Sequence, residues 1–246
     1  MTKLELQSII EKYHLDGLVE NVKWVINKDK TLSIDFMSPT KEMIGNVSIP
    51  HFPLPESQIG INNTSQLDKL LSITDSDLYL DYTKEQKVIT KLLISDKQFN
   101  LNYALADTLT VPKAGKYNGP EVYDLEIELL PEHITALIKA KNALSNSENV
   151  LIYALSSLGG GYQLDFIFGG DIEYSNKITY VIKDFLVSPG LEFKLTYNSE
   201  LLKSILACNK GAESSKLYMS SQGIMKLTFN HELGLNSTYY VVSKSQ

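Results

Sequence analysis

The chain has 246 residues, of which 43% are hydrophobic and 21% charged, a composition that can fill one or two cores and excludes an intrinsically disordered protein. Its 23 basic residues are all lysine, and 29 acidic residues bring the net charge to −6. The absence of arginine argues against sites that need a bidentate guanidinium fork, and the acidic balance argues against simple nucleic-acid binding by a basic domain.

The first half of the chain reads as two helices separated by strands. Residues 3–14 space Leu6, Ile9, Ile10 and Tyr13 as one face of a helix. A second helix is expected at 64–73, where Leu67, Leu70 and Leu71 share one side. Alternating apolar runs predict strands at 22–26, 32–37, 43–49, 78–82, 88–94 and 99–106.

The middle of the chain breaks this rhythm. Residues 107–123 contain two prolines and two glycines with little periodicity, which predicts an interdomain connector. The order of elements then repeats, with helices expected from Pro131 to about residue 142 and over 198–209, and strands at 124–129, 150–156, 162–168, 177–186, 192–197, 216–220, 225–230 and 238–242. We therefore predict an α+β fold of two similar domains, 1–106 and 124–246, joined by the connector 107–123.

Short sequence matches support an internal duplication. The segment S-Q-L-D-K at 65–69 parallels S-E-L-L-K at 199–203, each at the start of an expected helix. Shortly after each, Leu78-Tyr79-Leu80 parallels Leu217-Tyr218-Met219. Matches this short also arise by chance, so the agreement in the order of elements carries more weight than the letters.

No enzyme signature emerges from the chain. His14, His51, His133 and His231 are scattered and show no metal-ligand spacing. Cys208 is the only cysteine and lies in an apolar helical pattern, which favours packing over nucleophilic chemistry. The glycines at 159–161 join two expected strands and are interpreted as a hairpin turn. We expect no catalytic residue, no metal and no cofactor. Since no signal core or long apolar run is visible, we also expect a soluble intracellular protein without a membrane contact.

The polar faces of the four expected helices each carry lysine. Opposite the apolar stripes lie small residues together with Lys12, Lys69, Lys139, Lys203 and Lys210. Lys141 falls near the apolar side, so the third helix is expected to end or bend before it. The helical segments hold seven lysines and five acidic residues, a net of +2, whereas the rest of the chain holds 16 lysines and 24 acidic residues, a net of −8. Lysines also decorate ordinary solvated helices, so this segregation supports a function only together with the duplication and the connector.

The whole chain resembles the sliding clamps, the DNA polymerase processivity factors, and most closely the trimeric type of T-even-like phages and proliferating-cell nuclear antigen. The resemblance rests on the order of elements, the helix opening N-S-E-L-L-K-S-I-L at Asn198, the central connector and the closing strand at 239–242. It implies a two-domain DNA-clamp fold whose subunits close a ring as a homotrimer, with helices lining a central hole and antiparallel sheets outside. Such a viral (phage) ring would encircle duplex DNA in the cytoplasm of the host cell and tether the replicative DNA polymerase after an ATP-dependent clamp loader has placed it. The sequence departs from many relatives in lacking arginine and a first strand before helix one.

The resemblance also assigns site residues. The lysines just named, Lys12, Lys69, Lys139, Lys203 and Lys210, become the candidates for non-specific contact with DNA in the bore. Strands 99–106 and 177–186 would pair between subunits, with contacts from Phe99, Leu101, Tyr103, Tyr180 and Ile182. Partner peptides would dock under the connector, on Leu109, Val111, Tyr117 and Val242; plain packing of the connector on the body is an equally good interpretation of these four residues. The alternative function is a non-enzymatic structural or interaction protein of duplicated α+β domains, such as a virion component, without a role on DNA.

Overall fold

The computed structural model describes residues 1–75, 77–85, 88–115, 117–156, 162–170, 175–183 and 191–244. The chain divides into two compact units. Unit 1 comprises Met1–Lys116 with Glu232–Ser237, and unit 2 comprises Tyr117–His231 with Thr238–Gln246. Each unit consists of two helices and antiparallel strands, so the α+β class expected from the sequence is confirmed.

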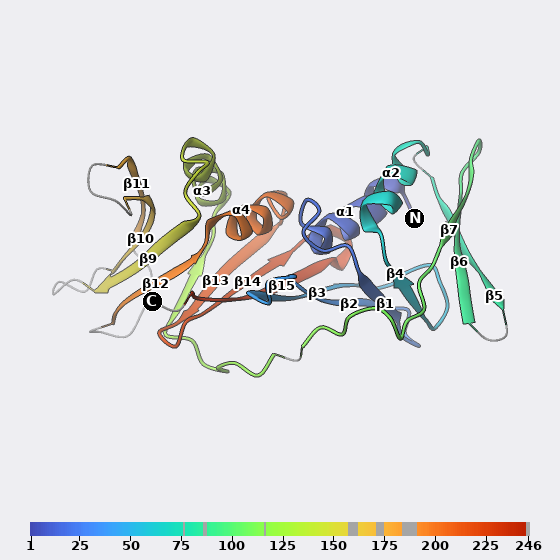
Figure 1. Ribbon diagram of the computed structural model, residues 1–246, viewed down its shortest axis with the longest axis horizontal. Helices are drawn as coiled ribbons and strands as arrows, with labels where there is room; N and C mark the ends of the chain where they lie inside the picture. Colours follow the sequence, from blue (N-terminus) through green and yellow to red (C-terminus); the bar gives the residue numbers. More distant parts are fainter. Residues whose placement is uncertain are drawn as a thin grey trace. The chain divides into compact units, whose positions relative to one another are not determined.

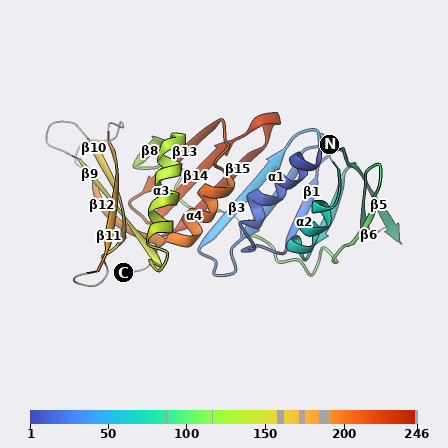
Figure 2. The same cartoon turned by 90° about the horizontal axis from the view of Figure 1, so that it is seen from above.

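In unit 1 the strands form two antiparallel sheets, ordered β4-β1-β2-β3 and β5-β6-β7 (Figure 1). The helices α1 and α2 pack against each other, and α1 also packs against β3 (Figure 2). The elements in chain order are α1 (Lys3–His14), β1 (Val22–Ile26), β2 (Leu32–Met37), β3 (Met43–Ile49), β4 (Ser57–Ile61), α2 (Thr64–Ser72), β5 (Tyr79–Glu85), β6 (Val88–Ser95) and β7 (Asn100–Ala104).

In unit 2 the strand orders are β11-β10-β9-β12 and β15-β14-β13-β8, and helices α3 and α4 pack against each other. The elements are β8 (Leu125–Glu128), α3 (Pro131–Ala143), β9 (Asn149–Ser156), β10 (Tyr162–Gly169), β11 (Lys177–Lys183), β12 (Glu192–Asn198), α4 (Ser199–Cys208), β13 (Ser214–Ser220), β14 (Ile224–Asn230) and β15 (Asn236–Val242). A short 3₁₀ turn, Glu232–Gly234, precedes β15.

The two units repeat the same backbone contacts at equivalent places. The amide of Thr64, the first residue of α2, donates to the carbonyl of Glu20, and the amide of Ser199, the first residue of α4, donates to the carbonyl of Glu148. The residues that follow the last strand of each unit also pair alike, Ala106 with Gly60 and Lys244 with Thr196. Because these contacts join elements far apart in the chain, the duplication extends to the tertiary structure. They align Thr64 with Ser199, so the match of 65–69 with 199–203 expected from the sequence is one residue out of register.

Most expected elements are present, several with ends shifted by one or two residues, and the following differences matter for the site. Strand β4 was not expected, because the prolines before it break the apolar alternation. Helix α3 runs without a break through Lys141 to Ala143, so the expected end before that lysine is wrong. Helix α4 ends at Cys208, which leaves Lys210 in the following turn. Strand β5 begins and ends later than expected. The turn predicted at 159–161 and residues 184–186 of the predicted strand 177–186 lie outside the described residues.

Three of the four α-helices that the structure describes begin after a residue whose side chain accepts from their free amides. The Thr2 hydroxyl accepts from the amide of Glu5, whose carboxylate accepts from the amide of Thr2, a capping box that starts α1. The side-chain oxygen of Asn63 accepts from the amide of Gln66 at the start of α2, and that of Asn198 accepts from the amides of Glu200 and Leu201 at the start of α4. Lys69 on α2 and Lys203 on α4 therefore lie on short helices whose first turns are fixed by a side-chain cap.

Candidate nucleic-acid interface and connector

The helix lysines fall into an exposed and a buried group. Lys69 in α2, Lys139 in α3 and Lys210 after α4 are exposed, and Lys203 in α4 is half-buried. Lys12 departs from the expectation, because it is only 4% exposed and belongs to the buried side of α1. It lies at the flank of the apolar stripe, directly before the buried Tyr13, and the equivalent residue of α3, Ala140, is buried too. A lysine in this position is not available to a phosphate.

A carboxylate on α4 organises two of the lysines of unit 2. The Glu200 carboxylate lies 2.7 Å from the Lys203 ammonium and 3.3 Å from that of Lys141. The hydrogen bond from Lys203 lowers the pKa of Glu200, and Lys141 acts in the same direction. Lys141 is 4% exposed and also donates to the carbonyl of Ser145 at 2.6 Å, which accounts for a lysine on the apolar side of α3. Lys203 is therefore held in place but partly neutralised.

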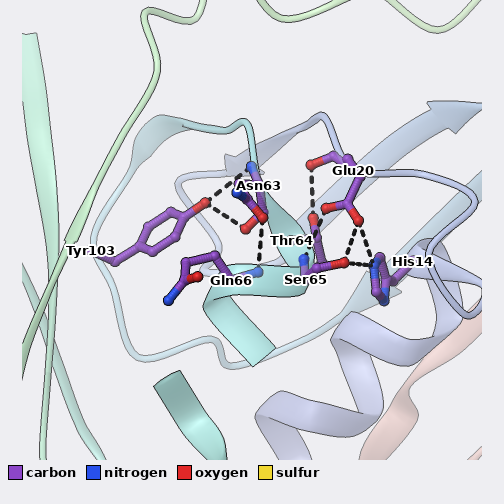
Figure 3. Close-up of polar contacts among 7 residues, drawn as sticks. All are labelled: His14, Glu20, Asn63, Thr64, Ser65, Gln66 and Tyr103. Carbon is purple, nitrogen blue, oxygen red and sulfur yellow. Dashed lines mark hydrogen bonds and ion pairs between the residues drawn. The ribbon is translucent and has the colours of Figure 1, made fainter. Parts of the chain in front are cut away.

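The start of α2 is held by a polar cluster made of His14, Glu20 and Ser65 (Figure 3). The Glu20 carboxylate accepts from the amide and the hydroxyl of Ser65, and Nε2 of His14 lies 3.2 Å from Glu20 Oε1 and 3.1 Å from Ser65 Oγ. Partial burial opposes the ionisation of Glu20, but the hydrogen bonds from Ser65 and His14 outweigh it and lower the pKa of this carboxyl.

This serine–histidine–glutamate group does not have the arrangement of a hydrolytic triad. In a triad the histidine accepts from the nucleophile with one ring nitrogen and donates to the carboxylate with the other. Here a single nitrogen, Nε2, faces both partners, and the serine hydroxyl itself donates to the carboxylate. The geometry fixes the end of α1 against the start of α2, which is a structural role.

Tyr103 of β7 forms a second, separate set of hydrogen bonds at the start of α2 (Figure 3). Its hydroxyl donates to the carbonyl of Asn63 at 2.9 Å and accepts from the amide of Asn63 at 3.2 Å, while the Asn63 side chain caps α2 by accepting from the amide of Gln66. Burial raises the pKa of Tyr103, so the hydroxyl stays protonated. Tyr103 is thus a core residue of unit 1, and its expected role as a contact between subunits is wrong.

The two strands expected at the subunit interface lie at the edges of their sheets. Strand β7 ends the order β5-β6-β7, and β11 ends the order β11-β10-β9-β12. Phe99 is 38% exposed and Leu101 half-buried at β7. On β11, Tyr180 is half-buried with its ring 6.2 Å from that of His133, whereas Ile182 is 4% exposed and packs into unit 2, which is a further correction. The edges remain candidates, but only three of the five side chains expected there, Phe99, Leu101 and Tyr180, are accessible.

The four residues expected to bind partner peptides are not equivalent. Leu109 is 87% exposed and Val242 48% exposed. Val111 is only 4% exposed and lies close to Gly60 in β4, so it anchors the connector to unit 1 and is not part of an open pocket. Tyr117 stacks on Tyr240 of β15, with 3.7 Å between the ring centroids. For Val111 and Tyr117 the interpretation as packing is the one the structure supports.

Sequence reasoning missed a cluster of aromatic rings that fastens the connector to unit 2. The Tyr117 hydroxyl lies 2.8 Å from that of Tyr123, whose ring lies 5.5 Å from that of Tyr218. The ammonium of Lys226 lies 4.9 Å from the ring centre of Tyr218 and 5.9 Å from that of Tyr240. Tyr218 and Lys226 are cross-strand neighbours in β13 and β14, a relation that only the register of the sheet reveals.

A cavity of about 280 Å³ lies beside the connector within unit 1. None of the four expected residues lines it. Its walls come from the loop after α1, the turn between β2 and β3, and the connector, through residues that include Leu18, Phe36, Met37, Pro39, Pro112 and Ala114. The sequence offered no signal for this cavity, because three separate segments form it.

We looked for two further kinds of site: clusters of metal-ligating side chains, and helices long and apolar enough to cross a membrane. Within the part of the chain that the structure describes, no group of three or more histidine, cysteine or acidic side chains is placed to hold a metal ion. Over the same residues, no helix has the length and hydropathy needed to span a membrane.

Comparisons with known proteins give matches only at the level of structure. No family model and no curated protein matches the sequence. The proliferating cell nuclear antigen (PCNA) of Entamoeba histolytica superposes with a TM-score of 0.73 at 16% identity, covering 99% of this chain and 96% of that one. PCNA of Thermococcus kodakaraensis gives 0.75 at 15% identity, covering 99% and 98% of the two chains. A. fulgidus PCNA with the C-terminal region of FEN-1 bound gives 0.74 at 15% identity, covering 100% and 97%.

These superpositions extend over both units and the connector at once. Identities of 15–16% are too low to carry over residue roles, but the TM-scores show a common fold. The chain therefore has the sliding-clamp fold of PCNA.

Proposed function

We propose that this protein is a sliding clamp that encircles duplex DNA and tethers a replicative DNA polymerase. The observation that carries the proposal is the superposition on PCNA over 99–100% of the chain, including both units and the connector. The exposed lysines on or next to three of the four helices, in a chain whose remaining residues are markedly acidic, agree with it.

The contact with DNA would be weak and independent of base sequence. Lys69, Lys139 and Lys210 are exposed, and Lys203 is close enough to the surface to join them. A ring is retained by enclosure, so a few lysines that meet phosphates, partly through water, are sufficient and leave the ring free to slide. The acidic remainder discourages adhesion of DNA to other surfaces.

Ring closure would use the open edges of β7 and β11. In a homotrimer, β7 of one subunit would pair with β11 of the next, as a strand added to a sheet edge, with Phe99, Leu101 and Tyr180 at the contact. Among clamps that form trimers, we favour the type of T-even-like phages, on the resemblance in sequence alone. A phage origin would place the protein in the cytoplasm of the host cell.

Partners would include the polymerase and an ATP-dependent clamp loader. The exposed Leu109 and Val242, together with the cavity beside the connector in unit 1, are the candidate docking places for short apolar segments of these proteins. The protein itself would supply no chemistry and need no cofactor.

Enclosure of DNA can be tested without knowing the loader. The solution mass is expected near three times the 27.6 kDa of one chain. Protein incubated with a circular plasmid and treated with a bifunctional amine crosslinker should stay on the DNA in high salt and leave it when the plasmid is linearised. A stable monomer, or retention that does not depend on circularity, contradicts the proposal and favours the structural or virion protein.

The lysine assignment needs its own variants. Changing Lys69, Lys139 and Lys210 to Ala should weaken DNA association before crosslinking and reduce the slope of log K against log salt by about one for each phosphate that is no longer neutralised. The matched control changes three exposed lysines outside the helices, Lys28, Lys91 and Lys97, to Ala. Equal reductions in affinity for the two triple variants would contradict the assignment.

A further inference from the structure

Lys203 differs from the other lysines assigned to DNA, because a carboxylate of its own helix holds it. Glu200 lies three residues earlier on α4 and places Oε1 2.7 Å from the Lys203 ammonium. Within the part of the chain that the structure describes, Lys69, Lys139 and Lys210 form no ion pair. One of the four lysines assigned to DNA thus has an intramolecular competitor for its charge.

The two oxygens of Glu200 have separate partners. Oε1 faces Lys203, whereas Oε2 lies 3.3 Å from the ammonium of Lys141. Lys141 is 4% exposed and also donates to the carbonyl of Ser145 at 2.6 Å, so it is fixed in the interior of unit 2. When Lys203 turns away, Glu200 therefore keeps one cationic partner and stays in place.

The pair between Glu200 and Lys203 is formed in the free protein but is easily opened. The hydrogen bond from Lys203 is the main reason that the pKa of Glu200 is lowered, so the carboxyl is ionised near neutrality. The side chains of Lys203 and Glu200 are 30% and 58% exposed, and at such exposure water and salt screen an ion pair strongly. A phosphate oxygen is also anionic and accepts the same kind of hydrogen bond, so it can replace the carboxylate at a small net cost.

We propose that Glu200 is a positioning residue for the DNA contact: it holds Lys203 in the free protein and exchanges it with a phosphate of duplex DNA. This proposal rests on the proposed clamp function. In the exchange, the hydrogen bond from Lys203 to Oε1 breaks and one to a phosphate oxygen forms, no proton is transferred, and Glu200 keeps Lys141. Since one ion pair replaces another, Lys203 adds little to the affinity for DNA.

This arrangement suits a protein that slides. Between one phosphate and the next, the ammonium of Lys203 returns to Glu200, so it is never left without an anionic partner. The step from phosphate to phosphate then has a low barrier at this lysine. A lysine without such a carboxylate binds each phosphate more strongly and is released more slowly.

Unit 1 has no such pair at the equivalent place. The alignment of the two units puts Ser65 and Asp68 of α2 at the positions of Glu200 and Lys203. Asp68 accepts from the side-chain amide of Gln7 at 3.2 Å. Exchange of a lysine between a carboxylate and a phosphate is therefore a property of α4 and not of α2.

The proposal can be tested by binding of the intact protein to a fluorescent duplex oligonucleotide, measured by anisotropy at several salt concentrations. Glu200→Gln should tighten binding about twofold for each Lys203 that contacts a phosphate, because the competing anion is gone. The slope of log K against log salt should become steeper by up to about one for each such contact. In a Lys203→Ala background, Glu200→Gln should give neither change.

Two controls separate this effect from net charge and from folding. The double variant Lys141→Met, Glu200→Gln has the net charge of the natural protein and leaves no buried ammonium without its carboxylate, and it should still bind DNA more tightly. Glu11→Gln removes one charge from an exposed site on α1, so any small gain that it causes should persist in the Lys203→Ala background. Urea unfolding midpoints check that each variant is folded.

Acetylation of individual lysines by acetic anhydride, followed by mass spectrometry, reports on Lys203 itself. Glu200→Gln should make Lys203 more reactive in the free protein, and DNA should protect it. The proposal is overturned if a folded Glu200→Gln variant binds DNA no more tightly, if the gain persists in the Lys203→Ala background, or if DNA protects Lys69 but not Lys203. If DNA protects none of these lysines and binds no variant, the clamp function fails, and this proposal fails with it.

Discussion

Units 1 and 2 share a backbone framework but stabilise the start of their second helix by different side chains. In both, the first residue of that helix bonds to the loop after the first helix, through Thr64 and the carbonyl of Glu20 or through Ser199 and the carbonyl of Glu148. In unit 1 the side chain of Glu20 then joins His14 and Ser65. In unit 2 Glu148 is exposed.

In unit 2 the corresponding carboxylate belongs to the helix itself, to Glu200 in the first turn of α4. Glu200, at the position of Ser65, pairs with the buried Lys141 and with Lys203. Each unit thus has one carboxylate near the positive end of a helix, where the macrodipole favours it, but the carboxylate comes from a loop in one and from the helix in the other. The comparison shows that the duplicated fold fixes where a carboxylate is useful and leaves open which residue supplies it.

The largest difference in stability between the two units is expected when Glu20 and Glu148, the glutamates in the loops after α1 and α3, are each changed to Ala. Glu20→Ala removes the acceptor for the amide and hydroxyl of Ser65 and should lower the free energy of unfolding by about 2 kcal/mol. Glu148→Ala, its counterpart, should change it by less than about 0.5 kcal/mol, because only the backbone carbonyl of Glu148 takes part. Urea unfolding of both variants measures this, and equal effects would contradict the described asymmetry.

Tyr103 provides a second contrast, because its counterpart in unit 2, Val241, has no hydroxyl. Tyr103→Phe removes both bonds to the backbone of Asn63 and should cost about 1–1.5 kcal/mol. In this variant the protection of the α2 amides against hydrogen exchange should also fall, while the protection of the α4 amides should stay unchanged. Tyr218→Phe serves as the control, since it makes the same chemical change in the other unit at a half-buried site. Reduced protection in both helices would mean that Tyr103 acts on the whole chain and not on the start of α2.

The acid response should follow from the lowered pKa of Glu20. A carboxyl whose folded pKa lies below its ordinary value of 4.5 adds stability above that pH and loses it as the pH falls through the folded pKa. The difference in urea midpoint between the natural protein and Glu20→Gln should therefore be constant near neutrality and shrink below about pH 4.5. A difference in urea midpoint that increases as the pH falls would contradict a lowered pKa for Glu20.

The sequence predicted the order of elements and the duplication well, because helix periodicity, strand alternation and turn residues are local signals. It failed where the answer depends on distant contacts. Lys12 was placed on a surface by helical periodicity and Tyr103 by the family resemblance, but Lys12 lies at the flank of a buried stripe and Tyr103 bonds across 40 residues to Asn63. The Tyr117, Tyr123 and Lys226 cluster depends on the register of β13 and β14, which no single segment encodes.

The smallest change in the free energy of unfolding is expected for Lys203→Ala. This variant can therefore show whether Lys203 contributes to DNA binding without a loss of stability. Its ammonium pairs with Glu200 at the surface, 30% exposed, so Lys203→Ala should change the free energy of unfolding by no more than about 0.5 kcal/mol. Lys141→Ala, which removes the buried partner of the same carboxylate, should cost more, because it leaves the Ser145 carbonyl without its donor. If Lys203 also serves DNA, its removal should weaken retention on circular DNA in a protein that is otherwise as stable as before. A Lys203 variant that is markedly unstable would instead assign this lysine to the framework of unit 2, like Lys141.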